Sequence, residues 1–379
     1  MVSDIQNSII IIGGGLVGNL LHLMLESKGF SINQFEKTSK LKNRTFALTP
    51  SSVDWLKSLG LPSKFFDSLN DISSMKIFDS TLSNSVTFES DDIAKPAIAF
   101  MANEKDFNEA IEKTFKKRKT IEEIPKDYVI KNKQDQVIIE TSKEQYKSSI
   151  IIACDGVNSL AREKIEIKST KHDFKQTAIT FQLKVKLDNQ NEAKQFFLKE
   201  SILAILPIKK DLVSIVWSCN SQFYKKIDSF DEKSIEDELN LTIGDFYKDI
   251  KVVSKIESFP LTMNRVESFF KDRVLLVGDA AHFIHPLAGQ GLNLGIRDII
   301  TLEKIIDKKG YADIGLKGFL RKYERARKED VVQMGFLTLG LNWIFSNKSS
   351  ILSRIVGKGM SMLDKSKLLK KQLIKKATA

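Results

Sequence analysis

Three short stretches of this 379-residue chain place glycines and acidic side chains at spacings that suit a bound dinucleotide. In the first stretch, Gly13, Gly15 and Gly18 follow the apolar residues 9–12. The first glycine suits a tight turn, the second lets the backbone approach a pyrophosphate, and the third lets a helix pack closely. Glu36 ends the second predicted strand, Ser31–Phe35, at a distance where an acid binds ribose hydroxyls. The same spacing also occurs in strand-to-helix turns without a ligand, so the flanking elements matter.

The residue at position 36 also indicates which dinucleotide would bind. Glu36, in place of an arginine, favours a free ribose 2′-hydroxyl and hence FAD or NAD over NADP. No second glycine fingerprint follows in the chain. If the protein uses both a flavin and a nicotinamide, the nicotinamide has no nucleotide-binding unit of its own.

The second stretch begins at Ser149, continues with the apolar residues 150–154 and places Asp155-Gly156 at the end of a predicted strand. Ser159 and Arg162 follow at helical spacing. Ser159 suits a helix cap or a ligand contact, and Arg162 suits a phosphate contact or a pair with Asp155. Open α/β sheets bind ligands at the carboxyl ends of their strands, which is where this stretch lies.

The third stretch begins as a buried strand, Val274–Val277, and ends in a helix predicted from about Leu292 to Ile306. Free amides and the positive end of the helix dipole at such an N-terminus suit a polar or anionic edge of a cofactor. Between the strand and the helix lie Gly278-Asp279, His285-Pro286 and Gly289-Gln290-Gly291.

The segments around these stretches show two different periodicities. Residues 9–36 predict a strand, a helix and a second strand, to which the other two stretches add buried strands. Residues 174–220 predict successive strands between polar turns, which indicates an antiparallel sheet. Helices are predicted near 231–240 and 243–249, and Lys251–Phe259 is predicted as the last strand of this insert. We predict an α/β fold with a Rossmann-like domain containing a parallel sheet, an inserted antiparallel β-sheet domain and C-terminal helices. The predicted parts are 1–70, 102–170 and 261–345 for the first domain, 71–101 and 171–260 for the insert, and 346–379 for a tail.

The composition, 42% hydrophobic and 28% charged, is that of a globular protein. No window approaches the roughly 18–20 apolar residues of a membrane-spanning helix. The polar first residues lead directly into a strand, which does not fit a signal peptide. Cys154 and Cys219 provide neither a disulfide framework nor a metal cluster, so we expect a reducing compartment and no structural metal.

The net charge of +11 is concentrated in the tail. Residues 348–379 contain nine Lys or Arg and one Asp, which amounts to +8 of the total. The remaining chain is nearly balanced, which argues against a nucleic-acid-binding face. Apolar residues of the tail recur at helical spacing with lysines on the other face, as in a helix that binds a membrane surface. The alternative is a terminal helix docked on its own domain with a solvated lysine face.

The order and separations of the three stretches resemble the group A flavoprotein aromatic hydroxylases, the class that includes p-hydroxybenzoate hydroxylase. The resemblance spans about residues 5–345. The segment 278–295 is most similar to the branch that hydroxylates polyprenylated phenols in ubiquinone biosynthesis. A lipid substrate also agrees with the basic tail.

The resemblance implies roles on the nucleotide side of a bound FAD. Gly13, Gly15 and Gly18 would hold the pyrophosphate, Glu36 the adenosine ribose, and Arg44 would lie along the pyrophosphate. After the predicted strand 98–101, this branch usually has Glu-Asn or an arginine. This chain has Asn103-Glu104 instead, so neither residue is given a role.

The resemblance also implies roles nearer the flavin ring. Asp155 would help to close the FAD and NAD(P)H region, and Asp279 would contact the ribityl or pyrophosphate part. His285 would lie near the flavin, where a packing or positioning role fits as well as a catalytic role. No catalytic acid or base is identified. Approach to the isoalloxazine is expected from Pro286 and from the backbone of Gly289, Gln290 and Gly291.

The implied chemistry is that of the cofactor. NADH or NADPH reduces FAD, reduced flavin and O₂ form a C4a-hydroperoxide, and its distal oxygen adds to an electron-rich phenol ring. The implied partners are a polyprenyl phenol, O₂, a membrane surface and other proteins of ubiquinone biosynthesis. We expect a cytoplasmic protein bound peripherally to the inner face of a bacterial inner membrane.

Other functions fit the same motifs. A hydroxylase of another aromatic or lipid substrate, a reductase of lipid double bonds or a halogenase would keep the fold. Trp55, Trp217 and Trp343 do not form the Trp-rich motif expected of a halogenase. A non-catalytic FAD-binding scaffold in a biosynthetic complex is a further alternative.

Overall fold

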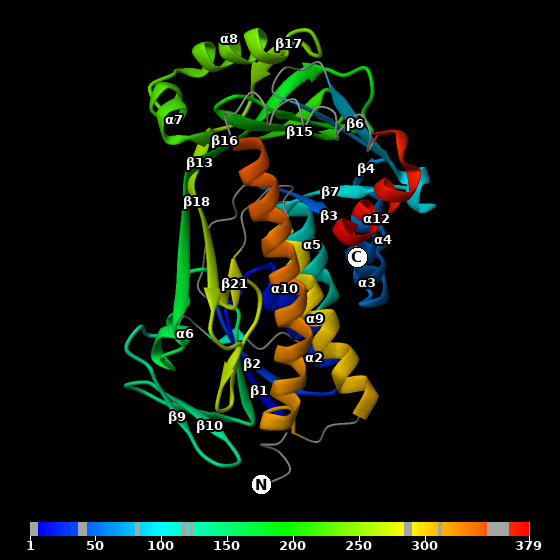
Figure 1. Cartoon of the computed structure of the whole chain (residues 1–379). Coiled ribbons are helices and arrows are strands. Elements are labelled where there is room, and N and C mark those ends of the chain that lie inside the picture. Colours follow the sequence, from blue (N-terminus) through cyan, green and yellow to red (C-terminus); the bar gives the residue numbers. More distant parts are fainter. Residues whose placement is uncertain are drawn as a thin grey trace.

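The first strand, β1 (Ser8–Ile12), lies inside a six-stranded sheet with the order β19-β20-β12-β1-β2-β8 (Figure 1). Its pairs are parallel except β19 with β20. The computed structural model describes residues 7–36, 44–79, 84–115, 120–121, 124–283, 290–309, 313–346 and 364–378. The other strands of this sheet are β2 (Ser31–Phe35), β8 (Thr120–Ile121), β12 (Ile150–Ala153), β19 (Phe270–Lys271) and β20 (Val274–Leu276).

The parallel order of β1 and β2 follows from the helix between them, α2 (Leu16–Ser27), which returns the chain to the starting edge. α2 packs against α9 (Gln290–Lys309), and α9 packs against α10 (Lys317–Ser346). β1 also contacts a small antiparallel sheet, so its isoleucines 9–11 are completely buried. The strands of that small sheet are β9 (Val129–Asn132), β10 (Val137–Glu140) and β11 (Gln145–Ser148).

The second large sheet has nine strands, in the order β21-β18-β13-β16-β15-β14-β5-β6, with β17 paired to β13. Only β14 and β5 pair in parallel. Two helices, α7 (Ser221–Ile227) and α8 (Glu232–Ile243), cover its outer face (Figure 1) and bury Phe181, Ile215 and Trp217. The strands are β5 (Ser74–Phe78), β6 (Ser85–Glu89), β13 (Ser169–Lys186), β14 (Glu192–Phe197), β15 (Ser201–Lys209), β16 (Leu212–Asn220), β17 (Lys248–Val252), β18 (Glu257–Val266) and β21 (His282–Phe283).

The prediction of one last strand at 251–259 is wrong, because this segment contains the end of β17 and the start of β18. β17 pairs with residues 183–186 of β13, and β18 pairs with residues 169–180 of the same strand. Between them, Ser254 Oγ accepts a hydrogen bond from the Gln182 amide at 2.8 Å. Apolar residues lie on both sides of this break, so a change of pairing along one long partner strand leaves no sequence signal.

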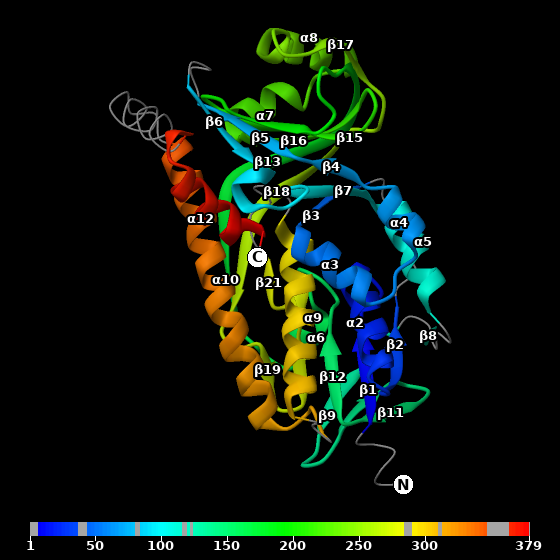
Figure 2. The same cartoon turned by 90° about the vertical axis from the view of Figure 1, so that its right-hand side faces the viewer.

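A three-stranded sheet lies between the two larger ones (Figure 2), formed by β3 (Thr45–Leu48), β7 (Ala99–Asn103) and β4 (Asn70–Ile72). The remaining helices are α3 (Pro50–Ser58), α4 (Ser63–Asp67), α5 (Glu104–Thr114), α6 (Leu160–Lys164) and α12 (Lys367–Thr378), with short 3-10 turns η1 (Ser90–Ile93) and η2 (Gly278–Ala280). In the described part of the chain, no helix has the length and apolar character needed to cross a bilayer. The predicted α/β fold with an antiparallel sheet and C-terminal helices is confirmed, whereas the domain boundaries stay a prediction.

Candidate functional site

Three turns meet at one edge of the six-stranded sheet. β20, β12 and β1 are neighbours and run in parallel, and they end at Leu276, Ala153 and Ile12. The turns that follow them are the three stretches singled out in the sequence. Their common edge is the carboxyl end of the strands, where ligands of open α/β sheets bind.

The turn after β1 has the shape that its glycines predict. Gly13 has a φ of +121°, and a Cβ there would collide with the carbonyl oxygen of Cys154. A Cβ at Gly18 would collide with the carbonyl oxygen of Gly13. Gly15 is different, because no described residue lies within 4 Å of its Cβ position. It is the N-cap of α2 and has no side chain, so the first amides of the helix donate no hydrogen bond to a capping side chain.

Buried side chains behind this turn hold it in place. Gln34 on β2 is fully buried, and its Nε2 donates to the Gly13 carbonyl and to Asn19 Oδ1, both at 2.9 Å. Its Oε1 lies 2.7 Å from Nδ1 of His22. This support was not predicted, because β2 has the sequence Ser-Ile-Asn-Gln-Phe and nothing in it marks Gln34 as the buried polar residue.

Glu36 directly follows β2 and lies against the same turn. A Cβ at Gly14 would collide with the Glu36 side chain. The structure therefore brings the predicted ribose-binding acid and the glycine turn together.

Arg44 precedes β3 and pairs with Glu104, the first residue of α5. Arg44 Nε donates to Glu104 Oε1 at 3.0 Å, and the glutamate is 4% exposed. The strand pairing explains the contact, since β3 and β7 are antiparallel with Thr45 opposite Asn103. Glu104, to which the sequence assigned no role, therefore orients the arginine expected at the pyrophosphate. Asn103 caps α5 by accepting a hydrogen bond from the Lys105 amide at 2.8 Å.

Asp155 follows β12 and lies at the start of α6. Its Oδ2 accepts a hydrogen bond from the Ala161 amide at 3.1 Å, and Ser159 caps the same helix by accepting from the Arg162 amide at 3.0 Å. Oδ1 of Asp155 is buried and has no hydrogen-bond partner in the described residues. Next to it, Gly156 has a φ of +82° and open space at its Cβ position.

The Arg162 guanidinium joins the second turn to the third. It donates to the carbonyl oxygens of Val157 at 2.9 Å and Ala280 at 2.8 Å. The ion pair between Arg162 and Asp155, which the spacing allowed, is not formed. The guanidinium donates its hydrogen bonds to these two backbone carbonyls instead. Arg162 thus fixes the distance between Asp155 and the turn that carries Asp279.

The third turn packs against the first through one valine. A Cβ at Gly278, which has a φ of +64°, would lie 3.2 Å from Cγ1 of Val17. A Cβ at Gly295 would lie 2.6 Å from Cγ2 of the same valine, so only glycine fits there without movement. Val17 belongs to the first turn of α2, so α2, the third turn and α9 form one packed unit.

The electrostatics of this turn centre on Asp279. Burial raises the pKa of its carboxyl above the ordinary value, while His282 and Arg44 act to lower it. The structure brings Gly13, Gly15, Gly18 and Glu36, Asp155 of the second stretch and Asp279 of the third to one edge of the sheet.

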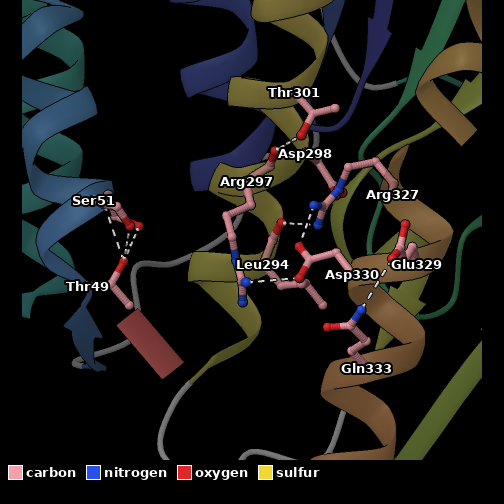
Figure 3. A network of polar contacts seen from close by, with 11 residues as sticks. Thr49, Ser51, Leu294, Arg297, Asp298, Thr301, Arg327, Glu329, Asp330 and Gln333 are labelled. Atoms are coloured by element: carbon pink, nitrogen blue, oxygen red, sulfur yellow. Dashed lines mark hydrogen bonds and ion pairs between the residues drawn. The ribbon is translucent and has the colours of Figure 1, made fainter. Parts of the chain in front are cut away.

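A charged network joins α9 to α10 (Figure 3). Asp298, which is completely buried, accepts from Arg327 Nε at 2.6 Å. Arg327 also donates from Nη1 to Asp330 at 2.5 Å, and Arg297 donates from Nη1 to the same carboxylate at 3.1 Å. This network was not predicted. The sequence does contain two signals for it: Arg297 and Asp298 are adjacent on one helix, and Asp330 follows Arg327 by three residues on the next.

The flavin-ring end of the site is partly outside the described residues. His285, Pro286 and Gly289 lie there, and their predicted roles stay predictions. Gln290 is the first residue of α9. Among the described residues, nothing lies within 4 Å of the Cβ position of Gly291.

A family model described as "FAD binding domain" matches residues 6–334. The chain belongs to this FAD-binding family. Ubiquinone biosynthesis monooxygenase COQ6 of Dictyostelium discoideum is 25% identical, and the match covers 97% of this chain and 90% of that protein. For 3-demethoxyubiquinol 3-hydroxylase of Escherichia coli the identity is 24%, over 97% of each chain. The crystal structure of p-nitrophenol 4-monooxygenase PnpA from Pseudomonas putida shares the fold, with a TM-score of 0.79 at 16% identity over 98% of each chain.

The residues at the sheet edge fit FAD. Gly15 and Gly291 lie at the starts of α2 and α9, and no described residue crowds their Cβ positions, which suits an anionic or electron-rich ligand edge at each helix N-terminus. Oδ1 of Asp155 is a buried acceptor that still needs a donor, and a ligand with hydroxyl groups provides donors. FAD is the cofactor of this chain.

Proposed function

We propose that this protein is a monooxygenase that uses FAD, NADH or NADPH, and O₂ to hydroxylate the ring of a polyprenylated phenol or benzoquinol in ubiquinone biosynthesis. One observation carries the proposal. The match to 3-demethoxyubiquinol 3-hydroxylase covers 97% of both chains, so it includes all three turns of the site and the nine-stranded sheet. With a relative that shared only a nucleotide-binding domain, the match would not include that sheet.

In this proposal the first turn and its neighbours hold the nucleotide half of FAD. The amides at Gly15 face the pyrophosphate, Gly13 and Gly18 shape the turn, and Glu36 accepts from the ribose hydroxyls. Arg44, oriented by Glu104, adds the positive charge that the pyrophosphate needs.

The second and third turns hold the other half. Asp155 and Asp279 accept hydrogen bonds from the ribityl and pyrophosphate region, and Pro286, Gly289, Gln290 and Gly291 approach the isoalloxazine. The N-terminus of α9 stabilises negative charge near Gln290 and Gly291 by its dipole and free amides. The segments 71–101 and 171–260 form the lobe that orients the phenol and keeps water away.

FAD supplies the electron transfer from NADH or NADPH and the oxygen-transfer chemistry. The chain's part is to bind, orient and exclude water. No side chain in the described residues is assigned as a catalytic acid or base, since an electron-rich phenol needs no more than a hydrogen bond at its hydroxyl group.

The experiment that tests the proposal measures NADH and NADPH oxidation together with O₂ uptake by the purified full-length chain. A prenylated phenol should stimulate both. NAD(P)H oxidation without O₂ uptake would favour a reductase, and bound FAD without any turnover would favour a non-catalytic scaffold.

The same proposal includes peripheral attachment to the inner face of a bacterial inner membrane. α12 exposes Leu368, Leu369 and Leu373, while its Ile374 packs into a small core with Ile72 and neighbouring residues. Lysines flank these leucines along the helix. Exposed leucines beside lysines suit an anionic bilayer surface.

A further inference from the structure

A single carboxylate, Asp298 on α9, holds both ends of the turn that carries Asp279. The Gly278 amide donates to its Oδ2 at 2.7 Å, and His282 Nε2 lies 2.8 Å from the same oxygen. Arg327 of α10 donates to Oδ1 at 2.6 Å. Asp298, His282 and Arg327 are all at most 3% exposed, so water does not compete for these bonds.

The chemistry of the three partners fits an ionised acid. Burial acts to raise the pKa of Asp298, but His282 and Arg327 outweigh burial and hold that pKa at about 2. An ionised carboxylate only accepts hydrogen bonds, so Nε2 of His282 carries the proton and donates. Asp298 therefore satisfies three buried donors that come from three separate elements.

The bonds define the shape of a five-residue segment. Gly278 immediately precedes Asp279, and His282 lies on β21, whose partner strand β18 belongs to the nine-stranded sheet. With both ends fixed by one carboxylate on α9, the backbone of Asp279 has little freedom to move. Val17 limits the same turn from the α2 side, because it touches the Cβ positions of Gly278 and Gly295.

We propose that Asp298 is a positioning residue for FAD, which it serves by fixing the Gly278–His282 turn so that Asp279 stays in reach of the cofactor. The inference rests on the proposed contact between Asp279 and FAD. Asp298 lies behind the turn and acts only through Gly278 and His282. Arg327 supplies the charge that keeps the carboxylate ionised and connects the turn to α10.

Two variants test this inference in the full-length chain. Asp298→Leu has no acceptor and leaves the Gly278 amide buried without a partner. Asp298→Asn keeps one oxygen for Gly278 and His282 but presents N–H groups to Arg327. The dissociation constant of FAD, measured by fluorescence titration of the apoprotein, should rise from wild type to Asn to Leu. For Asp298→Leu we expect a rise of about tenfold or more, which corresponds to one lost hydrogen bond to a charged acceptor.

A matched control is Asp313→Asn. Asp313 and Arg273 form another buried ion pair, with bonds of 3.1 and 2.9 Å, but Arg273 lies at the start of β20 and not at its turn. This control should lower the Tm while changing the FAD dissociation constant by no more than about twofold, as for an independent site. The near-ultraviolet and visible circular dichroism of bound FAD should change only in the Asp298 variants.

The outcomes separate this inference from the proposed function. If Asp298→Asn and Asp298→Leu raise the FAD dissociation constant no more than Asp313→Asn does at an equal loss of Tm, Asp298 is structural only. If Asp298→Leu does not fold, the comparison of the two Asn variants decides alone. If Asp279→Ala leaves FAD affinity unchanged, the proposed cofactor contact itself is wrong, whatever the Asp298 variants show.

Discussion

The glycines of the first turn differ in what surrounds them, and this decides their separate functions. Gly13 and Gly18 are required by contacts within the protein, because a Cβ at either would strike a backbone carbonyl. Among the described residues, nothing lies within 4 Å of a Cβ at Gly15, which leaves room there for the proposed ligand. The close contacts at Gly13 and Gly18 agree with the spacing, because they depend on local backbone geometry, whereas the predicted contact of Gly15 with a pyrophosphate stays a prediction.

This difference predicts opposite effects for two alanine variants. Gly18→Ala should lower the free energy of unfolding of the apoprotein by about 1–3 kcal/mol, as overpacking does. Gly15→Ala should leave that free energy within about 0.5 kcal/mol and instead weaken FAD binding. Urea denaturation of both apoproteins, beside FAD titration, measures the two effects. Equal destabilisation by both substitutions would contradict the assignment of the open space.

Buried polar side chains behind the turns were harder to predict. Glu104 orients Arg44 only because β3 and β7 pair in one register, and Gln34 reaches Gly13 across the β2–α2 interface. Neither contact follows from spacing along the chain. A polar residue within an apolar run indicates a buried partner, but only the packed structure identifies which residue it is.

The buried acid on α9 predicts a pH dependence. The pKa of Asp298 is lowered to about 2 by His282 and Arg327 against the effect of burial. A carboxyl with a lowered pKa stabilises the fold at pH above its unfolded value of about 3.9, and this contribution disappears as pH falls through the folded value. The stability difference between wild type and Asp298→Asn should be about 2–3 kcal/mol larger at pH 6 than at pH 2. Urea denaturation at a series of pH values measures it, and a constant difference would contradict the ionised state.

At the scale of the element, the structure of α12 distinguishes between the two predicted roles of the tail. The spacing of apolar residues predicted a lysine-rich helix that seeks a membrane surface or docks on its own domain. In the described residues, the helix docks: Ile374 is buried and Lys370 donates to the Thr87 carbonyl at 3.0 Å. The leucines of the same helix stay exposed, because Ile374 and not these leucines is the buried residue, so the proposed membrane contact remains compatible with docking.

Replacing Leu368, Leu369 and Leu373 together by serine should therefore weaken sedimentation with anionic phospholipid vesicles and leave bound FAD unchanged. The loss of three inserted leucines removes apolar contact with the bilayer. The control Ile374→Ala should lower the Tm, since it opens a cavity in the small core. Unaltered vesicle binding by the triple variant would exclude α12 as the attachment site.

At the scale of the whole molecule, the chain builds one site by returning three times to the same sheet edge. β1, β12 and β20 each end there. In the nine-stranded sheet, β5 and β6 precede β12, β13 to β18 lie between β12 and β20, and β21 follows β20. The order of the motifs predicted this arrangement, since parallel strands must share a carboxyl edge. The exact pairing of β17 and β18 with β13 was not predictable, because one long strand accepts both.

The central claim is that this FAD-binding chain transfers one atom of O₂ to a phenol ring. The most direct measurement supplies the purified protein with NADH or NADPH, a short-chain prenylated phenol and isotopically labelled O₂, and analyses the product by mass spectrometry. The account predicts a ring-hydroxylated product that carries one labelled oxygen atom, in amounts that match NAD(P)H consumed. A product whose new oxygen comes from water, or O₂ converted only to hydrogen peroxide with every prenylated phenol supplied, would contradict it.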